Sequence, residues 1–359
     1  MKFLFFISDI SSKGGTERIS FKLANYLVEN GHSVTFASWK TSEEELKFPL
    51  NPQVSVMHLS YVDDFSKLSI IKNICKLRVL LKTSDIDFLV DIDSVLTPFS
   101  LLALVAVKCK HVVWEHFNAT INLGVKRRDL GRKLAAKYAD KCVVLTEEDK
   151  QLWSQLYDAK NVIAIYNPVT IDIASTIVPV KNKKIVLAVG RLTSQKGFDR
   201  LLKSWALIKP ENKKNSLLRI AGSGEQEEEL KALAVKLDIE DEVDFYGFSS
   251  DIGLLYQDAY CYVLPSRYEG FVLSLTEAMA SGLPVISYDC LCGPKELLIN
   301  DSGLLVKSGD IQQLAHEVER VLVNEELRNT LANNALIRSQ DFSDEKIMPI
   351  WIKLFEELS

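Results

Sequence analysis

Residues 265–286, PSRYEGFVLSLTEAMASGLPVI, contain the end of one strand, a turn, a helix and the start of another strand. Gly270 permits the turn, and the helix closes at Gly282, just before Pro284 and the next apolar run. A helix that joins two apolar strands in this way is typical of α/β domains. The stretch therefore predicts one unit of a parallel sheet covered by helices.

The same alternation of short apolar runs and longer helical segments extends over the whole chain. In the first half the predicted strands are residues 2–8, 33–39, 54–60, 87–92, 111–115, 141–146 and 161–166. In the second half they are residues 184–190, 216–222, 243–247, 260–265 and 284–289. We therefore expect an α/β protein with two Rossmann-like, doubly wound domains, residues 1–170 and 184–341, facing each other across a cleft. Residues 171–183 are the expected linker, because they show no sustained period.

The composition of the 359-residue chain excludes several classes of protein. A net charge of −5 argues against a dedicated nucleic-acid binder, although residues 1–175 carry a net +2 and residues 176–359 a net −7. The six cysteines form no C-x-x-C pair, so we expect core thiols in a reducing compartment. No uncharged run is longer than 14 residues, and the N-terminus lacks a signal-peptide cleavage site. These features predict a cytoplasmic protein.

Residues that directly follow the strands are candidates for the site, because open α/β sheets bind ligands at the carboxyl ends of their strands. Gly14 and Gly15 follow the first strand and open a helix, where they either admit a phosphate to the backbone or simply form a tight turn. Arg191 and Lys196 follow the first strand of the second half. Together they could neutralise a diphosphate without a metal, whereas singly each could be an ordinary solvated side chain.

Two glutamates flank the start of the predicted helix within 265–286. Glu269 lies just before it and Glu277 eight residues later, about two turns in, so both could point toward one pocket. Backbone amides at the helix start remain available to phosphate oxygens. The residues concerned are Gly270, Phe271, Val272 and Leu273. Carboxylates for a ribose and a sugar, with amides for a diphosphate, outline a nucleotide-sugar site; two surface glutamates around a helix are the alternative.

With these motifs the sequence resembles the retaining glycosyltransferases of family 4, which have the GT-B fold. The resemblance rests on the E-x7-E motif from Glu269 to Glu277. It is supported by GGTER at 14–18, GRLTSQKGF at 190–198 and CGPKELL at 292–298. These motifs occur in the family's order over nearly the whole chain.

The resemblance implies roles for individual residues. Arg191 and Lys196 would bind the donor diphosphate, and Gly15 would close over the phosphates from the other domain. Glu277 would bind the ribose and Glu269 the transferred sugar. Neither a cofactor nor a metal is implied. The family's last helix commonly crosses back to the first domain, and residues 342–359 could form it.

Residues of the first half also match family positions. His116, in HVVWEHFN, matches a histidine that many members place beside the donor sugar, so we predict a catalytic contact there. Glu115 is a weaker candidate, since only one of two neighbours on an extended segment normally faces a site. Asp91 and Asp93 resemble a metal-binding D-x-D pair, but that pair belongs to a different glycosyltransferase fold with one Rossmann-like domain, and we expect no metal.

Two basic stretches, residues 67–82 and 126–137, carry apolar residues at helical spacing. Each either lies on an anionic membrane surface or is a solvated helix whose apolar face packs on the sheet. Because family members commonly extend lipid-linked or lipopolysaccharide acceptors, the resemblance favours a protein bound peripherally to the inner face of the cell membrane.

The resemblance thus implies a retaining, metal-independent hexosyltransferase. The donor would be a nucleoside diphosphate sugar carrying a hexose or N-acetylhexosamine, with a UDP-sugar preferred and GDP-mannose second. The acceptor would be a lipid-linked or lipopolysaccharide glycan. A nucleotide-sugar epimerase of the same fold and a noncatalytic nucleotide-sugar sensor are the alternatives.

Overall fold

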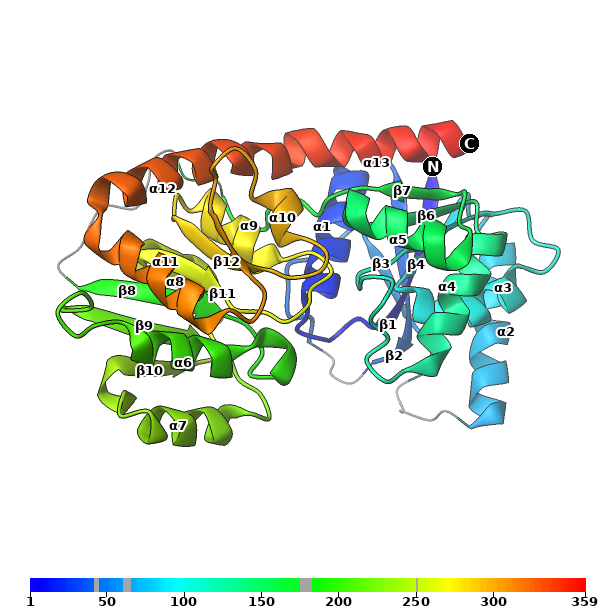
Figure 1. Ribbon diagram of the computed structural model, residues 1–359. Helices are drawn as coiled ribbons and strands as arrows, with labels where there is room; N and C mark the ends of the chain where they lie inside the picture. Colours follow the sequence, from blue (N-terminus) through cyan, green and yellow to red (C-terminus); the bar gives the residue numbers. More distant parts are fainter. Residues whose placement is uncertain (42–44, 61–65, 173, 175–182, 250) are drawn as a thin grey trace. The chain divides into compact units, whose positions relative to one another are not determined.

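The computed structural model describes residues 1–41, 45–60, 66–172, 174, 183–249 and 251–359 (Figure 1). The chain forms two compact units: Met1–Thr170 together with Ile347–Ser359, and Ile171–Lys346. Most of the expected linker, residues 171–183, lies outside the described residues. Each unit contains one parallel sheet with helices packed on it.

The sheet of the first unit has the strand order β3-β2-β1-β4-β5-β6-β7, with every pair parallel. Its strands are β1 (Lys2–Asp9), β2 (Ser33–Lys40), β3 (Ser55–His58), β4 (Phe88–Ile92), β5 (Lys110–Trp114), β6 (Lys141–Val144) and β7 (Val162–Ala164). In β1 the five residues from Phe3 to Ile7 are all buried. A strand covered on both faces is apolar throughout, which is why it appears in the sequence as a continuous apolar run.

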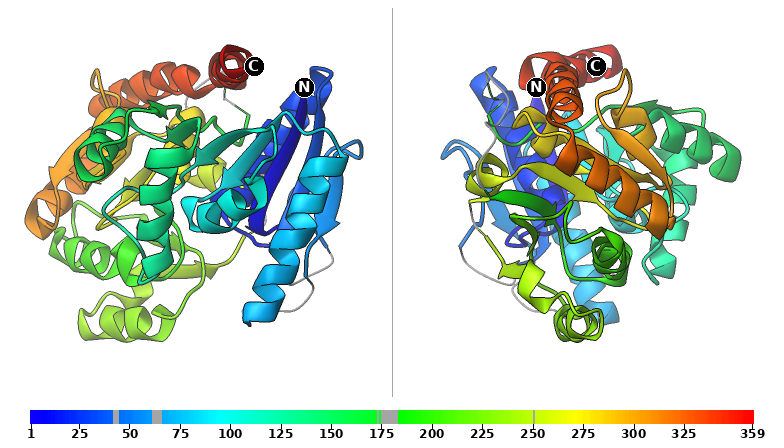
Figure 2. Two further views of the ribbon diagram at one scale, coloured as in Figure 1. Left: turned by 90° about the vertical axis from the view of Figure 1, so that its right-hand side faces the viewer. Right: turned by 60° about the vertical axis from the view of Figure 1, so that its left-hand side comes forward.

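Helices cover both faces of this sheet (Figure 2). They are α1 (Gly15–Glu29), α2 (Lys67–Thr83), α3 (Thr97–Leu104), α4 (Lys126–Tyr138) and α5 (Glu147–Tyr157), with a 3₁₀ turn, η1 (Ser94–Leu96), before α3. Leu4 and Phe6 of β1 pack in one cluster with residues of α2 and α3. Phe3 points to the opposite face, where its ring lies 4.7 Å from that of Phe355.

Phe355 belongs to α13 (Asp344–Leu358), the last helix of the chain. The ring of Phe355 also lies 5.0 Å from that of Phe88, and Trp351 lies 4.6 Å from Trp114. Residues 347–359 are therefore part of the first unit, and the two chain termini lie close together (Figure 1). Buried aromatic contacts on three strands hold this helix.

The sheet of the second unit has the order β10-β9-β8-β11-β12-β13, again parallel. Its strands are β8 (Lys184–Val189), β9 (Ser216–Ala221), β10 (Val243–Gly247), β11 (Cys261–Leu264), β12 (Val285–Asp289) and β13 (Leu304–Lys307). Its helices are α6 (Phe198–Leu207), α7 (Glu227–Lys236), α8 (Ile252–Asp258), α9 (Leu273–Ala280), α10 (Pro294–Leu297), α11 (Ile311–Val323) and α12 (Glu325–Ser339). It also contains the 3₁₀ turns η2 (Ser194–Lys196), η3 (Glu240–Glu242) and η4 (Gln340–Phe342).

Both sheets share the order third, second, first, fourth, fifth, sixth, so the predicted doubly wound architecture is confirmed. Strand β13 was not predicted, because it is a four-residue edge strand within the polar segment DSGLLVKSGD. In both sheets the first strand lies at the point where the strand order reverses. Its carboxyl end is therefore the expected place for a ligand.

Candidate active site

Loops at the carboxyl ends of β8, β9 and β11 are in direct backbone contact, and glycines make this contact possible. A Cβ atom on Gly222 would lie 1.9 Å from the carbonyl oxygen of Gly190. Gly197 has a φ of +67°, and a Cβ atom there would lie 2.1 Å from the carbonyl oxygen of Pro265. No other residue type fits at either position without moving the backbone. These glycines bring residues 190–197 against residues 265–269.

Side chains join the same two loops. Arg267 forms two hydrogen bonds with the carboxylate of Asp199, at 2.8 and 2.9 Å, and a third with the carbonyl oxygen of Ser194 at 2.7 Å. Gln195 donates to the carbonyl oxygen of Tyr268 at 3.1 Å. A two-pronged Arg–carboxylate pair fixes orientation as well as distance. The loop that carries Lys196 is thereby held beside the loop that carries Glu269.

Lys196 and Glu269 form an ion pair, with Nζ 2.8 Å from Oε1. The same carboxylate oxygen accepts a hydrogen bond from the hydroxyl of Ser266 at 2.6 Å. Glu269 is 5% exposed, so these two donors offset the desolvation of its carboxylate. The cation predicted for the diphosphate and the carboxylate predicted for the sugar therefore lie side by side. Arg191, the second predicted cation, is exposed at the end of β8.

Glu277 lies in α9 and is 3% exposed. Its carboxylate accepts a hydrogen bond from the hydroxyl of Tyr256 at 3.0 Å. The hydroxyl of Tyr262 is 2.7 Å from that of Ser274 in the same helix. Burial raises the pKa of Tyr262, and the charges of Glu269 and Glu277 raise it further. Both glutamates therefore lie near one buried tyrosine, and the alternative of two surface glutamates is wrong.

Sequence reasoning missed Tyr256 and Tyr262 as members of this site. Tyr256 comes from α8 and Tyr262 from β11, and both are fully buried. In the sequence they stand in apolar runs that predict core positions. Only their hydroxyl groups, which reach Glu277 and Ser274, distinguish them from ordinary core aromatics.

The helix after Glu269 begins four residues after that glutamate rather than directly behind it. Leu273 is its first residue and Val272 is the N-cap, so Gly270 and Phe271 precede the helix. Phe271 is buried against Phe342, with the ring centres 6.2 Å apart. No side chain among the described residues caps α9. Its start therefore presents backbone amides to the loop that holds Glu269.

In the first unit, Glu115 and His116 have different environments. Glu115 is buried and accepts hydrogen bonds from Arg132 at 2.8 Å and from Ser94 at 2.5 Å. Although burial acts in the opposite direction, the charges of Arg132 and Arg128 hold its pKa below the usual value. These contacts make Glu115 a structural residue.

His116 is 9% exposed and its ring lies 4.7 Å from that of Trp114. Burial lowers its pKa to about 4, so the imidazole is neutral near pH 7. None of the described residues forms a hydrogen bond with its buried Nε2. A neutral imidazole with an unused nitrogen can accept from, or donate to, a ligand hydroxyl.

The predicted glycines at the start of α1 have a partner within the helix. Gly15 is the first helical residue, and the backbone N–H of Gly14 donates to Oε2 of Glu17 at 3.1 Å. The Glu17 carboxylate thus lies at the helix start, where the sequence predicted a phosphate. A phosphate could bind there only if the Glu17 side chain moved.

The carboxylates of Asp91 and Asp93 are held by different protein groups. Asp91 accepts from Thr97 at 3.0 Å and lies 2.9 Å from His111, whereas Asp93 pairs with Arg128 at 2.5 Å. Within the part of the chain that the structure describes, no cluster of three or more His, Cys, Asp or Glu side chains is arranged to hold a metal.

Comparison with known proteins identifies the family. Residues 13–173 match the family described as Glycosyltransferase Family 4, and residues 172–338 match Glycosyl transferases group 1. An uncharacterized glycosyltransferase of Haemophilus influenzae is 36% identical over 97% of this chain and 98% of that protein. The chain belongs to glycosyltransferase family 4. It is a retaining hexosyltransferase, as the motifs predicted, and the epimerase and sensor alternatives are set aside.

Two further relatives bear on the fold and the reaction. A Campylobacter jejuni α-1,4-N-acetyl-D-galactosaminyltransferase, whose name includes a diphosphate-undecaprenol substrate, is 30% identical over 100% of this chain and 99% of that protein. The crystal structure of Anabaena Alr3699/HepE in complex with UDP-glucose superposes with a TM-score of 0.81 at 19% identity, covering 99% of each chain. This likeness confirms the predicted GT-B fold.

In this family 4 enzyme, not every cation of the two basic stretches is available to a membrane surface. Arg128 and Arg132 of α4 are buried in ion pairs with Asp93 and Glu115, so they cannot face a membrane. In α2, Lys76 and Arg78 donate to backbone carbonyls of the same unit. The exposed basic residues of the two helices are Lys67, Lys72, Lys76, Lys82, Lys126, Lys133 and Lys137. None of the described helices is long and apolar enough to span a bilayer.

Proposed function

We propose that this enzyme transfers a hexose or N-acetylhexosamine from a nucleoside diphosphate sugar to a lipid-linked or lipopolysaccharide glycan. A UDP-sugar is the preferred donor and GDP-mannose the second choice. The ion pair between Lys196 and Glu269 carries the proposal. A cation suited to a diphosphate stands 2.8 Å from a carboxylate suited to sugar hydroxyls, as the sugar–phosphate bond of such a donor requires.

Each remaining group has a role in this reaction. Glu277 binds the ribose, and the amides at the start of α9 bind phosphate oxygens together with Arg191. His116 offers a neutral imidazole to a hydroxyl of the donor sugar, since burial suppresses its charge. We keep Gly14 and Gly15 as a phosphate contact that requires Glu17 to move away from the helix start.

The reaction breaks the bond between the anomeric carbon and the diphosphate and forms one to the acceptor oxygen on the same face. The leaving diphosphate oxygen takes the proton of the acceptor hydroxyl. Lys196, Arg191 and the helix amides stabilise the negative charge that develops on the diphosphate. No step in this scheme requires a metal ion. The protein's contribution is mainly electrostatic.

The relatives and the surface of the first unit support a membrane-bound acceptor. The Campylobacter jejuni relative is named for an undecaprenol-linked substrate. Along α2 the apolar residues Leu68, Ile71 and Val79 are 81, 58 and 59% exposed. Exposed lysines flank them, as in helices that lie on anionic bilayers. The adjoining helix α3 and the following turn add exposed Leu102 and Val105.

Isosteric changes of the two glutamates test the assignment of roles. Glu277→Gln should raise the dissociation constant for UDP about 10- to 100-fold, because a charge-assisted contact to the ribose is lost. Glu269→Gln should leave UDP binding unchanged or tighter, because it releases Lys196 from its partner, but should reduce sugar transfer. Calorimetry with UDP and a transfer assay with a UDP-sugar would measure both.

Glu228→Gln is the matched control, since this carboxylate is 88% exposed on α7. It should change neither measurement. An equal loss of UDP affinity in the Glu277 and Glu269 variants would contradict the division of roles. Failure of the unaltered enzyme to bind any nucleotide sugar would contradict the proposal as a whole.

A further inference from the structure

Asp149 is a buried acidic residue to which the proposed reaction assigns no role. It lies in the first turn of α5, is 3% exposed, and its backbone N–H donates to the hydroxyl oxygen of Thr146 at 3.1 Å. An acidic side chain at this position of a helix commonly turns back to the N-cap backbone. Here Oδ1 of Asp149 instead accepts from the backbone N–H of Ala119, at 2.7 Å. The carboxylate therefore joins α5 to the loop that follows β5, 30 residues earlier in the chain.

Three side chains hold the backbone of Ala119. While Asp149 accepts from its N–H, its carbonyl oxygen accepts from Nη1 of Arg132 at 2.9 Å and from the hydroxyl of Tyr157 at 3.0 Å. The Ala119 methyl group is buried in an apolar cluster that includes Trp153 of α5. We call the three polar side chains the Ala119 clamp. They fix the middle of the loop from both α4 and α5.

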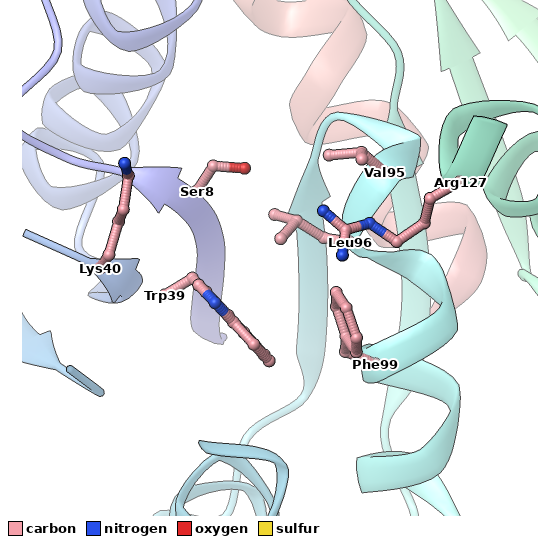
Figure 3. Close-up of a pocket in the computed structure, with 7 residues that line it drawn as sticks. All are labelled: Ser8, Trp39, Lys40, Val95, Leu96, Phe99 and Arg127. Atoms are coloured by element: carbon pink, nitrogen blue, oxygen red, sulfur yellow. The ribbon is translucent and has the colours of Figure 1, made fainter. Parts of the chain in front are cut away.

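The α4 side of the Ala119 clamp is itself held against neighbouring elements. A Cβ atom on Gly131, next to Arg132, would lie 1.9 Å from the carbonyl oxygen of Ser94, so α4 packs on η1 without space between them. Figure 3 shows Arg127, at the start of the same helix, beside Phe99 of α3, where the guanidinium lies 5.1 Å from the ring centre. Helix α4 is therefore a fixed support for the loop.

The Asp149 side of the clamp can change its charge. Among the described residues none forms an ion pair with Asp149. Burial raises its pKa to about 7; the charges of Glu115 and Glu148 act in the same direction, whereas the Ala119 N–H and Arg132 act against them. Arg132 stays charged because Glu115 raises its pKa, although burial acts in the opposite direction. Near neutral pH, Asp149 thus gains or loses a proton while Arg132 does not.

The loop held by the Ala119 clamp carries His116. Its imidazole, with the buried Nε2, lies three residues before Ala119. Between them, the backbone N–H of Phe117 donates to Oε1 of Glu115 at 3.0 Å. The segment is short and hydrogen-bonded at both ends, so a displacement of Ala119 moves the imidazole as well.

We propose that Asp149 is a positioning residue for His116: as a carboxylate it holds Ala119 and the loop in place for the donor sugar, and with a proton bound it holds them less firmly. The inference rests on the proposed contact of His116 with the donor sugar and adds a dependence on pH to it. A charged acceptor binds an N–H about twice as strongly as a neutral one, so the proton weakens this contact without abolishing it. Use of the donor sugar should therefore decline as the pH falls through about 7.

Nuclear magnetic resonance of the full chain tests the clamp directly. Two alanines of the sequence follow an asparagine, Ala119 and Ala335. Labelling with ¹³C-carbonyl asparagine and ¹⁵N-alanine therefore selects their two amide signals. The Ala119 amide proton should move upfield between pH 8 and 6, with a midpoint near 7, whereas Ala335, buried in α12, should show no such titration. An Ala119 signal that does not move over this range would overturn the inference.

The ring of His116 reports whether the clamp acts on the site. In the chain labelled with ¹³Cε1-histidine, its signal is assigned through His116→Gln. The pKa of His116 is about 4, so the imidazole itself stays neutral between pH 8 and 6. Its signal should nevertheless move with the same midpoint as Ala119, and should not move in Asp149→Asn. A signal that is constant in the unaltered enzyme, or that still moves in Asp149→Asn, would contradict the positioning role.

Hydrolysis of the donor gives the functional readout and needs no acceptor. Release of the nucleoside diphosphate is followed with UDP-glucose, UDP-N-acetylglucosamine and GDP-mannose. For the donor that is hydrolysed, kcat should fall about three- to tenfold between pH 8 and 6 in the unaltered enzyme, whereas in Asp149→Asn it should be low and constant. Glu147→Gln removes an exposed carboxylate from the same turn of α5 and should keep the pH profile of the unaltered enzyme. Equal profiles for Asp149→Asn and the unaltered enzyme would overturn the inference.

The same samples separate this inference from the proposed function. Asp149→Asn should bind UDP at pH 8 as the unaltered enzyme does, because Arg191, Lys196 and Glu277 lie in the second unit. If no nucleotide sugar binds to the unaltered enzyme, the proposed function fails. The Ala119 and His116 signals would then decide by themselves whether Asp149 controls the position of this loop.

Discussion

Lys196 and Glu269 are each other's partners in a partly buried ion pair, and a bound donor would have to compete for both of them. A diphosphate would share Lys196 with Glu269, and sugar hydroxyls would donate to the carboxylate. Removal of Lys196 alone would leave Glu269 buried with one donor fewer, which costs stability as well as binding. The milder exchange of Glu269 for glutamine is therefore the more informative variant at this pair.

His116 gives a pH prediction at the scale of one residue. Its pKa is about 4 in the folded chain and 6.5 when exposed, so the unfolded chain binds the extra proton. The stabilisation is complete above pH 6.5 and is lost as the pH falls toward 4. Between pH 7 and 4.5 the unaltered enzyme should lose about 2–3 kcal/mol more unfolding free energy than His116→Gln. Urea unfolding followed by tryptophan fluorescence would measure this difference, and parallel pH curves for the two proteins would contradict it.

At the scale of elements, α4 fixes the loop that follows β5. Arg132 is fully buried and donates to the carboxylate of Glu115 and to the carbonyl oxygens of Ala119 and Ile121, the latter two at 2.9 Å. One guanidinium thereby satisfies backbone carbonyl groups of the loop that follows β5 and contains His116. One of the basic residues that suggested a surface helix, Arg132, is therefore buried and holds this loop in place.

Arg132→Met should destabilise the protein by about 3–5 kcal/mol, because it leaves the buried Glu115 carboxylate without its cation. The double variant Arg132→Met/Glu115→Gln should recover part of this loss, since the remaining buried group is neutral. Lys133→Met is the control, because Lys133 is exposed on the same helix and should change the unfolding free energy little. Urea denaturation of the three variants would measure the effects. Arg132→Met within about 1 kcal/mol of the unaltered enzyme would refute the anchoring role.

At the scale of the whole molecule, charge differs between the two halves of the chain. Residues 1–175 carry a net +2 and residues 176–359 a net −7. The exposed lysines and apolar residues of α2, α3 and α4 all belong to the first unit. An anionic bilayer would therefore attract the first unit and repel much of the second.

The structure selects the lysines with which to test membrane binding. A fourfold variant should reduce sedimentation with vesicles of phosphatidylglycerol and phosphatidylcholine more than tenfold, since each lysine near such a surface contributes about 1 kcal/mol. The substitutions are Lys67→Ser, Lys72→Ser, Lys126→Ser and Lys133→Ser, all at exposed positions. Transfer to a short soluble acceptor should remain near that of the unaltered enzyme.

The control removes the same charge from exposed positions of the second unit. Its substitutions are Lys209→Ser, Lys214→Ser, Lys236→Ser and Lys307→Ser. This control should sediment as the unaltered enzyme does. Added salt should release the control and the unaltered enzyme from the vesicles, because the Debye length is only about 8 Å at physiological ionic strength. Equal effects of the two fourfold variants would exclude a membrane surface on the first unit.

Much of the architecture follows from the sequence alone. Strands buried on both faces must be apolar throughout, and the helices between them must be amphipathic, so both patterns are visible without a structure. The E-x7-E spacing likewise defines which glutamates stand near the start of α9. The short edge strand β13 escaped this reasoning, because four residues in a polar segment do not establish a pattern.

Only the tertiary structure decided which charged groups have partners. Lys196 and Glu269 are 73 residues apart in the chain, and Arg132 reaches Glu115 across 17. Trp39 and Phe99 meet because β2 and the segment after β4 end at the same edge of the sheet. Periodicity depends on the local geometry of one element, whereas these contacts depend on strand order and loop packing. The position of a charge in the sequence therefore cannot distinguish a membrane-facing arginine from a buried anchor.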